Sequence, residues 1–327
     1  MGSTRMLLRA CLGALAGAAL LAWPAAAQTY PTHTITAISP IGAGNAVDIT
    51  GRIVFDQMSK QMGVPIIIEN RPGGGGLVGF NDVAKATPDG YTILLGSSTF
   101  SSGVVLHKKL PYDPLKDFIA VIPFGESPSV LVTAPTKGFK TVADLVAAVK
   151  AKPGAMNYAS AGIGAASHIA AERFRVAAGL EAQHVPFRGP NEALAEVIAG
   201  RIDYYFLPIA AGLSLMQGGK LTALAVSTPK RAPLMPDVPT IAEAGYPAAE
   251  YLFWGGLFVP AKTPPDIVKR LYDEGRKALD QPSVQTALAK LGYEPMNMTS
   301  AEYQSFFDKD LAETVRLAKQ VGITPTD

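Results

Sequence analysis

Two stretches of this chain repeat one order of predicted elements, and this repeat constrains the fold more than any other feature. The first passes from the β-branched run Thr34–Ile38 through a glycine-containing loop into a helix, and the second does the same from Met156 through Gly162-Ile163-Gly164. In both, a glycine, a strand with Val-Pro, an arginine, another helix and a closing strand follow. Pro40–Leu95 matches Ser160–Leu207 at an offset of roughly 112–120 residues. We therefore predict a structural duplication of two copies, not a solenoid.

The order of elements within each copy predicts an α/β fold. Strands alternate with helices as β-α-β-α-β, which is typical of a parallel sheet with helices on its faces. Ligands of open α/β sheets bind beyond the carboxyl ends of the strands. Two lobes built alike would therefore present two matching loops to one crevice. The predicted architecture is two-lobed, with a central cleft.

The two loops have the composition of an anion site. Glycines let a loop turn sharply and let its backbone approach a ligand. A helix N-terminus just beyond the loop offers unpaired N–H groups and partial positive charge. The first loop is Ile41–Ala46 and the second is Gly162–Ala165. Either loop alone is better explained by packing, but the second copy favours a shared ligand site.

Residues 1–27 have the pattern of a secretory signal peptide. Arg5 and Arg9 precede the apolar run Cys11–Trp23, and small residues lead up to Ala27. We expect an exported, periplasmic protein cleaved near Ala27. Without Arg5 and Arg9, the 29 Lys+Arg fall to 27 against 27 Asp+Glu, which argues against nucleic acid or an anionic membrane as the main partner. The only cysteine, Cys11, lies in this leader, so we expect no disulfide and no thiolate metal site.

Motifs for cofactors, metals and catalysis are incomplete. Gly74–Gly79 fits G-x-G-x-x-G, but no carboxylate ends the following strand, so we expect no dinucleotide cofactor. The four histidines lack zinc-site spacing, and only His168 falls in a loop–helix unit of the repeat. No G-x-S-x-G motif is present. Ser97, Ser98 and Ser160 stand at strand ends, where hydroxyls suit ligand recognition, while a triad formed only in space stays open as an alternative.

Several motifs along the mature chain resemble those of one known family. They are Ile67–Gly74 (IIENRPGG), Ala86–Leu94 (ATPDGYTIL), Leu110–Phe118 (LPYDPLKDF), Asn157–Gly164 (NYASAGIG), His184–Gly189 (HVPFRG), Gly219–Val226 (GKLTALAV) and Pro236–Gly245 (PDVPTIAEAG). In these residues the chain is similar to the substrate-binding proteins of tripartite tricarboxylate transporters, also called the Bug family.

This resemblance implies a type II periplasmic binding protein of the Venus-flytrap kind. Its first lobe would comprise residues 28–126 plus 252–327 and its second lobe residues 127–251, with hinge crossings near Phe124–Ser127 and Glu250–Trp254. Family members close over small carboxylates, which they hold with backbone N–H groups and ordered water, without catalysis. The implied partners are a small organic acid and the membrane permease subunits. We expect a monomer with no cofactor, no metal and no nucleic-acid partner.

The family pattern and the two loops together define one candidate ligand site. We expect it to contain Ile41, Gly42, Ala43, Gly44, Asn45, Asp48, Ser97, Ser98, Ser160, Gly162, Gly164, Ala165, His168, Asp203 and Leu207.

The chain departs from the family pattern inside this site. Val47, Ala165 and Leu207 stand where a hydroxyl or a carboxylate is usual. Because an unpaired buried polar group costs about 1–3 kcal/mol, a site without these groups disfavours a polyanion such as citrate. We hypothesise a ligand with one carboxylate and a mostly apolar or aromatic body. Its lining would draw on Phe100, Phe187, Tyr205 or Trp254. The alternative is that the missing groups faced water.

Two other functions fit the same cleft. One is a ligand-binding partner of a sensor kinase, which adjacent genes would separate from transport. The other is a periplasmic serine hydrolase, which needs Ser160 or Ser97 within about 3 Å of His168.

Overall fold

The computed structural model describes residues 30–44, 46–323 and 325. The expected signal peptide with its cleavage site, and Asn45, lie outside these residues. The chain divides into one unit of Met1–Thr32 and a second of His33–Asp327. Both β-sheets belong to the second unit. Within the described part of the chain, no helix is long and apolar enough to cross a membrane.

The first sheet has five strands in the order β2-β1-β3-β10-β4. Strands β1, β2 and β3 are parallel, and β10 pairs antiparallel with both β3 and β4. The bounds are β1 (Ile35–Ser39), β2 (Ile66–Asn70), β3 (Thr92–Ser97), β4 (Phe118–Ser127) and β10 (Phe253–Pro260).

The second sheet repeats this order as β7-β6-β8-β5-β9. Strands β6, β7 and β8 are parallel, and β5 is antiparallel to β8 and β9. The shared order confirms the predicted duplication. The sheets are mixed, not parallel as predicted, because β5 and β10 each enter after the chain has crossed from the other sheet. The bounds are β5 (Ser129–Thr133), β6 (Asn157–Ser160), β7 (Gln183–Pro186), β8 (Tyr204–Pro208) and β9 (Thr222–Val226).

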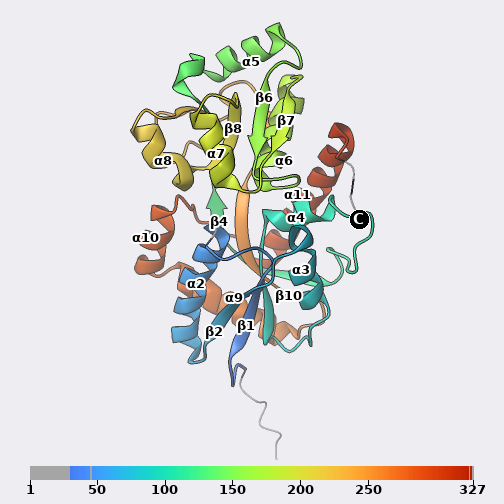
Figure 1. Cartoon of the computed structure of the whole chain (residues 1–327). Coiled ribbons are helices and arrows are strands. Elements are labelled where there is room, and N and C mark those ends of the chain that lie inside the picture. Colours follow the sequence, from blue (N-terminus) through green and yellow to red (C-terminus); the bar gives the residue numbers. More distant parts are fainter. Residues whose placement is uncertain (1–29, 45, 324, 326–327) are drawn as a thin grey trace, which may run out of the picture. The chain divides into compact units, whose positions relative to one another are not determined.

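Helices lie on the faces of both sheets (Figure 1). In the first lobe, defined here as the elements around the first sheet, they are α2 (Ala46–Met62), α3 (Leu77–Ala84), α4 (Ser98–Val104), α9 (Pro265–Leu279), α10 (Pro282–Lys290) and α11 (Ser300–Val321). In the second lobe, around the second sheet, they are α5 (Val142–Ala151), α6 (Ala166–Ala178), α7 (Pro190–Ile198) and α8 (Ile209–Gln217). Short 3₁₀ turns η1 (Gly74–Gly76), η2 (Pro135–Lys137) and η3 (Pro247–Ala249) complete the chain.

Aromatic side chains fill the core of the first lobe. Phe100 stacks on Phe80 at 4.2 Å between ring centroids, and both belong to a buried cluster with Trp254, Phe258 and Tyr303. The second sheet has an apolar cluster on each face, one with Phe174 of α6 and one with Val197 of α7. Each sheet is thus buried on both faces, and this packing fixes the positions of its strand ends.

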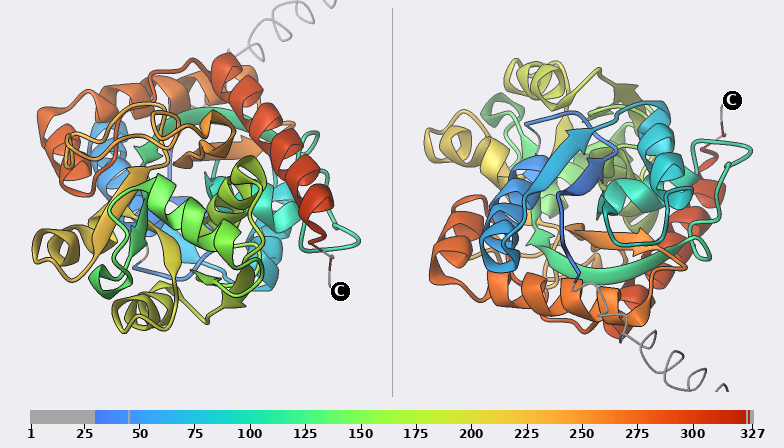
Figure 2. Two further views of the ribbon diagram at one scale, coloured as in Figure 1. Left: turned by 90° about the horizontal axis from the view of Figure 1, so that it is seen from above. Right: turned by 90° about the horizontal axis from the view of Figure 1, so that it is seen from below.

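The last helix, α11, packs on both lobes. It contacts α4 of the first lobe and α6 of the second (Figure 2). Leu317 near its end is buried in the second lobe's core, where Tyr251 also lies. Arg173 of α6 lies 3.8 Å from the carboxylate of Asp310 and donates to the Glu250 carbonyl at 3.0 Å. The helix therefore joins the lobes in addition to the two chain crossings.

Strand β10 contains a glycine pair that offers a matched test of packing. A Cβ at Gly256 would lie 2.7 Å from the Ile122 carbonyl oxygen and against the Tyr303 hydroxyl, whereas a Cβ at Gly255 meets nothing closer than 3.7 Å. Gly256→Ala should therefore lower the free energy of unfolding by about 1–3 kcal/mol. Gly255→Ala should cost clearly less. Urea unfolding of both variants measures the difference, and equal losses would contradict this account of β10.

Candidate functional site

Both glycine loops line one cavity of about 270 Å³. The first lobe contributes the end of β1, the loop after β2 and one face of α4, and the second lobe contributes the loop after β6. The lining residues are Pro40, Ile41, Gly42, Pro72, Gly73, Gly75, Gly76, Thr99, Ser102, Leu106, Ala161, Gly162, Ile163, Gly164 and Ala165. The cavity, hereafter the cleft, thus joins the carboxyl ends of the parallel strands of both sheets.

The cleft lining has a distinctive chemistry. Among its described residues there is no charged side chain and no histidine, and the side-chain polar groups are the hydroxyls of Thr99 and Ser102. Apolar groups come from residues such as Ile41, Leu106 and Ile163. An anion placed here would meet backbone dipoles in place of a counter-ion.

Asp48 stabilises the conformation of the first loop through hydrogen bonds and an ion pair. The Gly44 N–H donates to its Oδ2 at 2.9 Å, and Asn70 Nδ2 donates to its Oδ1 at 2.9 Å. The same Asn70 amide donates to the Ile41 carbonyl at 3.0 Å, and Arg52 pairs with the carboxylate at 2.9 Å. Burial raises the pKa of Asp48, but the hydrogen bonds from Arg52, Gly44 and Asn70 outweigh it and hold the pKa below its usual value. Asp48 is therefore ionised and positions the loop backbone; it does not line the cleft.

A serine and two histidines hold the second loop. The Ser160 hydroxyl lies 2.6 Å from His184 Nε2, donates to the Gly162 carbonyl at 3.0 Å and accepts from the Gly162 N–H at 3.2 Å. His168 Nδ1 accepts the Gly164 N–H at 3.1 Å, and its ring stacks on His184 at 3.9 Å. Burial lowers the pKa of His168, and burial together with the charge of His168 lowers that of His184 to about 3. Both rings are therefore neutral near pH 7.

The N-terminus of α6 is left without a side-chain cap. Its N-cap residue is Ala165, which lines the cleft and has no hydroxyl or carboxylate to accept a helix N–H. The His168 N–H bonds back to the Ala165 carbonyl at 2.9 Å. In the described part of the chain no acceptor is found for the N–H groups of Ala166 and Ser167. Two helix amides with partial positive charge are therefore available at the cleft.

Helix α4 forms a third wall of the cleft that the sequence did not predict. Thr99 and Ser102 have i, i+3 spacing on α4, which places them on one helical face, and both line the cleft together with Leu106, which follows the helix in a turn. Ser97 is the N-cap and accepts the Thr99 N–H at 3.3 Å. The sequence pattern placed Ser97 and Ser98 at a strand end and predicted no helix after it. The sequence signal for this helix was Ser97, because serine is favoured at helix N-caps.

The structure brings together only some of the residues predicted for the site. Ile41, Gly42, Gly162, Gly164 and Ala165 line the cleft. Ala43 and Gly44 lie exposed in the first loop beside them, and Asn45 is outside the described residues. Ser97 and Ser98 are buried at the start of α4, and Asp48, Ser160 and His168 support the loops from behind.

Asp203 and Leu207 are not among the residues that line the cleft. Asp203 accepts the Asn157 N–H at 2.8 Å and pairs with Lys137 at 2.6 Å, so it sits at the amino ends of β6 and β8, away from the loops. Leu207 is buried in the apolar cluster under α7. The suggested aromatic lining is also absent from the cleft. Phe100, Trp254 and Tyr205 are buried in the lobe cores, and the partly buried Phe187 packs against the second lobe's core.

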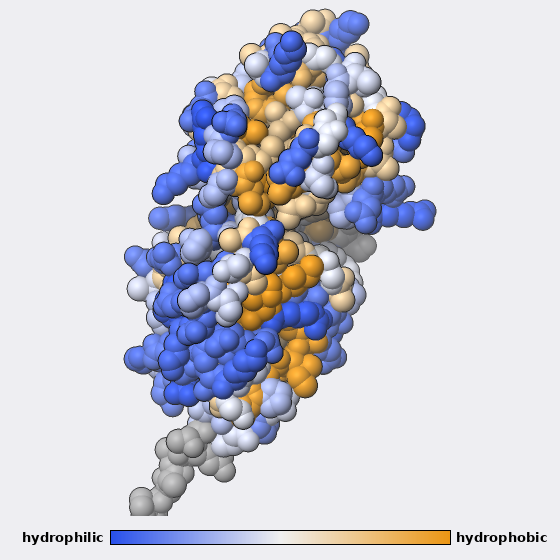
Figure 3. Space-filling view, turned by 90° about the vertical axis from the view of Figure 1, so that its left-hand side faces the viewer, coloured by the Kyte–Doolittle hydropathy of each residue, from blue (hydrophilic) through white to orange (hydrophobic). Residues whose placement is uncertain are grey.

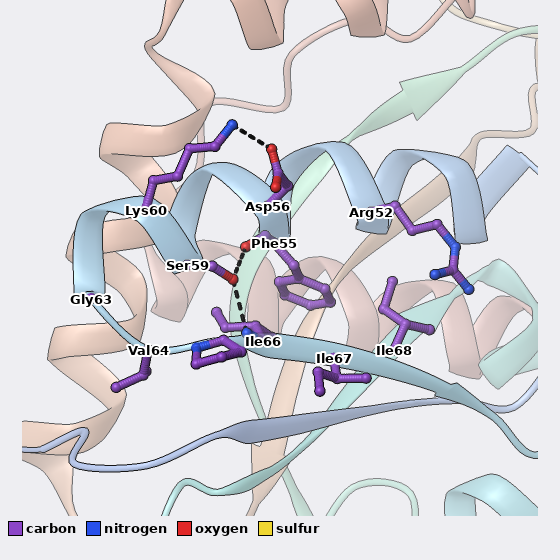
Figure 4. A pocket seen from close by; sticks show the side chains of 11 residues that line it. Arg52, Phe55, Asp56, Ser59, Lys60, Gly63, Val64, Ile66, Ile67 and Ile68 are labelled. Carbon is purple, nitrogen blue, oxygen red and sulfur yellow. Dashed lines mark hydrogen bonds and ion pairs between the residues drawn. The ribbon is translucent and has the colours of Figure 1, made fainter.

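A second hollow of about 650 Å³ lies between α2 and the edge strand β2 (Figure 4). Its polar groups satisfy one another: Lys60 pairs with Asp56 at 2.6 Å, and Ser59 accepts the Ile66 N–H at 2.8 Å. On the α2 and α10 side of the molecule, Figure 3 shows apolar side chains beside charged ones. No set of unpaired groups converges in this hollow among the described residues, so the cleft remains the candidate site.

The fold and the cleft define the class of two-lobed solute-binding proteins. Residues 50–323 match the family described as tripartite tricarboxylate transporter family receptor. Protein BugT of Bordetella pertussis is 31% identical over 324 residues, which cover 98% of this chain and 99% of that protein. The chain belongs to this receptor family.

Solved structures agree with this assignment. The Rhodopseudomonas palustris protein Rpa4515, solved with adipate, superposes with a TM-score of 0.80 at 30% identity, over 91% of this chain and all (100%) of that one. MatC from Rhodopseudomonas palustris, solved with bound malate, gives 0.76 at 32% identity, over 88% and 99%. The predicted α/β fold of a two-lobed periplasmic binding protein and the resemblance to the Bug family are confirmed.

The two loop-supporting histidines should make stability depend on pH. Because their folded-state pKa values lie below the unfolded value of 6.5, the unfolded chain takes up protons first as pH falls below 6.5. We expect this proton uptake to lower the free energy of unfolding by about 1 kcal/mol between pH 6.5 and 5. This loss is smaller than the full linkage limit because His184 is partly exposed. Burial raises the pKa of Glu126 to about 7, which acts in the opposite direction.

The measurement is therefore a difference between proteins. His168→Asn with His184→Gln keeps polar acceptors and removes both titrations, so this variant should show a flatter loss of stability in acid than the unchanged protein. His107→Gln, outside the cluster, is the control. Equal pH profiles for all three proteins would refute the role of this pair.

Proposed function

We propose that this chain is a periplasmic receptor that binds a small carboxylate between its lobes and delivers it to the membrane subunits of a tripartite tricarboxylate-type transporter. The observation that carries this proposal is the uncapped N-terminus of α6 opening into an uncharged cleft that both lobes line. Free helix amides bind a carboxylate without a cationic side chain. In this proposal the receptor is monomeric, and its lobes are residues 28–126 plus 252–327 and residues 127–251.

The ligand we propose is a small acid with one carboxylate on α6 and a largely apolar body. The cleft, at about 270 Å³, lies just below the usual range for drug-sized ligands. Pro40, Ile41, Pro72 and Ile163 give it apolar walls. Thr99 and Ser102 offer one further polar contact. Adipate and malate, which occupy the two related structures, support a carboxylate, and the lining supports the apolar body.

The proposed receptor carries out no catalysis. Ser160 is fully buried, and its hydroxyl is held by His184 and by both backbone groups of Gly162. His168, the histidine that the hydrolase alternative needs close to Ser160 or Ser97, instead accepts the Gly164 N–H. A buried hydroxyl that holds a loop in shape cannot reach a substrate in the cleft. These contacts support binding and give the hydrolase alternative no support.

A thermal-shift panel tests the ligand class. Benzoate-type monocarboxylates, dicarboxylates, glutamate and citrate are each added to the purified protein. A ligand at 100 times its Kd adds about 2.7 kcal/mol of stability, which is a shift of several degrees for a protein of this size. We expect small acids with an apolar body to give the largest shifts. Stabilisation by citrate alone would exclude the apolar ligand.

Ala165→Asp tests the binding geometry separately from stability. An aspartate at the N-cap would accept the free amides itself, which should stabilise α6 by about 0.5–2 kcal/mol. It should also repel the ligand, so the acid-induced shift should be lost while the ligand-free melting temperature rises. Ala195→Asp, which adds the same charge on the exposed part of α7, is the control and should keep the shift. A full acid-induced shift in Ala165→Asp would show that the carboxylate binds elsewhere.

A further inference from the structure

Leu106 occupies the space between the glycine loops of the two lobes. Its side chain packs on Gly75 of the first lobe, where a Cβ would lie 2.7 Å from Leu106 Cδ1. It also packs on Gly164 of the second lobe, where a Cβ would lie 2.5 Å from Cδ2 and 2.8 Å from Cγ. Both glycines have positive φ, 63° and 74°. The Leu106 side chain therefore occupies space that is open because both neighbouring positions are glycines.

The backbone around Leu106 is fixed, so this side chain cannot easily withdraw. The Leu106 N–H donates to the Gly103 carbonyl at 3.2 Å as α4 ends. The next residue, His107, bonds through Nε2 to the Gly74 carbonyl at 2.7 Å. These contacts tie the segment to α4 on one side and to the loop after β2 on the other. Leu106 is thus a rigid apolar wall of the cleft.

The position of Leu106 relative to the polar groups gives it a definite role. Thr99 and Ser102 of α4 line the cleft with Leu106, which follows this helix in a turn, and Ala165 at the uncapped end of α6 lines the same cleft. A ligand whose carboxylate binds α6 would direct its body toward this wall. The wall would then limit how long that body can be.

We propose that Leu106 is a specificity-determining residue that restricts this receptor to short-chain organic acids and completes the contact between the lobes. This proposal rests on the proposed function, because it assigns the substrate class of the same cleft. Replacing Leu106 with alanine would remove three carbons from the wall and extend the cleft. Each further methylene that a ligand buries there should then improve its affinity about fourfold.

Binding of two homologous series tests the proposal. The probes are the straight-chain dicarboxylates succinate to suberate and the monocarboxylates butanoate to octanoate, measured by calorimetry on the full mature chain. The unchanged protein should favour the shorter acids. In Leu106→Ala the acid that binds most tightly should be about two or three carbons longer than in the unchanged protein. The ratio of the affinity for the long acids to that for the short acids should change by at least about tenfold. Leu106→Val should give an intermediate change and covers the case in which the alanine variant fails to fold.

The controls separate this inference from the proposed function. Leu115→Ala makes the same substitution at an exposed site of the first lobe, where the leucine is 50% accessible, and should leave the preference unchanged. If acids bind both proteins but Leu106→Ala and Leu106→Val keep the original chain-length preference, the role of Leu106 is overturned and the receptor function stands. If no acid of either series binds the unchanged protein but an acid of the thermal-shift panel does, the role of Leu106 is overturned and the receptor function stands. If no acid of either series or of the panel binds, both proposals are overturned.

Discussion

The hydrogen bonds that fix the two glycine loops are the interaction on which the rest of this structure depends. Such loops have many accessible conformations, and a site built from backbone atoms needs one of them. Asp48 and Asn70 fix the first loop through Gly44 and Ile41. In the second loop a neutral set, Ser160 and the stacked histidines, has the same task. Each lobe thus has polar residues that fix its glycine loop, although these residues differ in chemistry between the lobes.

This arrangement keeps charge away from the ligand. The Asp48 carboxylate is neutralised by Arg52 behind its loop, and the histidines are neutral, so the described lining of the cleft has no ionised side chain. In the proposed function, the helix amides at the uncapped start of α6, beside the cleft-lining Ala165, would receive the anion. No charged group then dominates recognition, so the shape of the apolar walls would decide which acids fit. Selectivity can then change through single apolar residues while the fold stays the same.

The sequence predicted the repeat, the two-lobed fold and the two glycine loops, because strand–loop–helix order and glycine spacing are local patterns. It did not predict β4, whose last residues, Phe124–Ser127, were expected to form a hinge crossing. β4 is an edge strand, and a proline, which cannot donate to a ladder, is tolerated there because one side of an edge strand has no partner strand. Helix α4 was not predicted either. Asp203 directly precedes β8 and therefore lies at its amino end, away from the residues that line the cleft. The roles of Asp48 and His168 depend on contacts that form only in three dimensions.

The packing of α11 across both lobes has a consequence for movement. If the lobes separated directly, Leu317 would leave the second lobe's core, and exposing a leucine costs about 1.5–3 kcal/mol. A rotation about an axis close to α11 would keep this contact and that of Arg173 with Asp310. We therefore expect the helix to act as a third tether that makes the motion a twist of small amplitude. Sequence changes near the C-terminus would then alter how readily the receptor opens, far from the cleft itself.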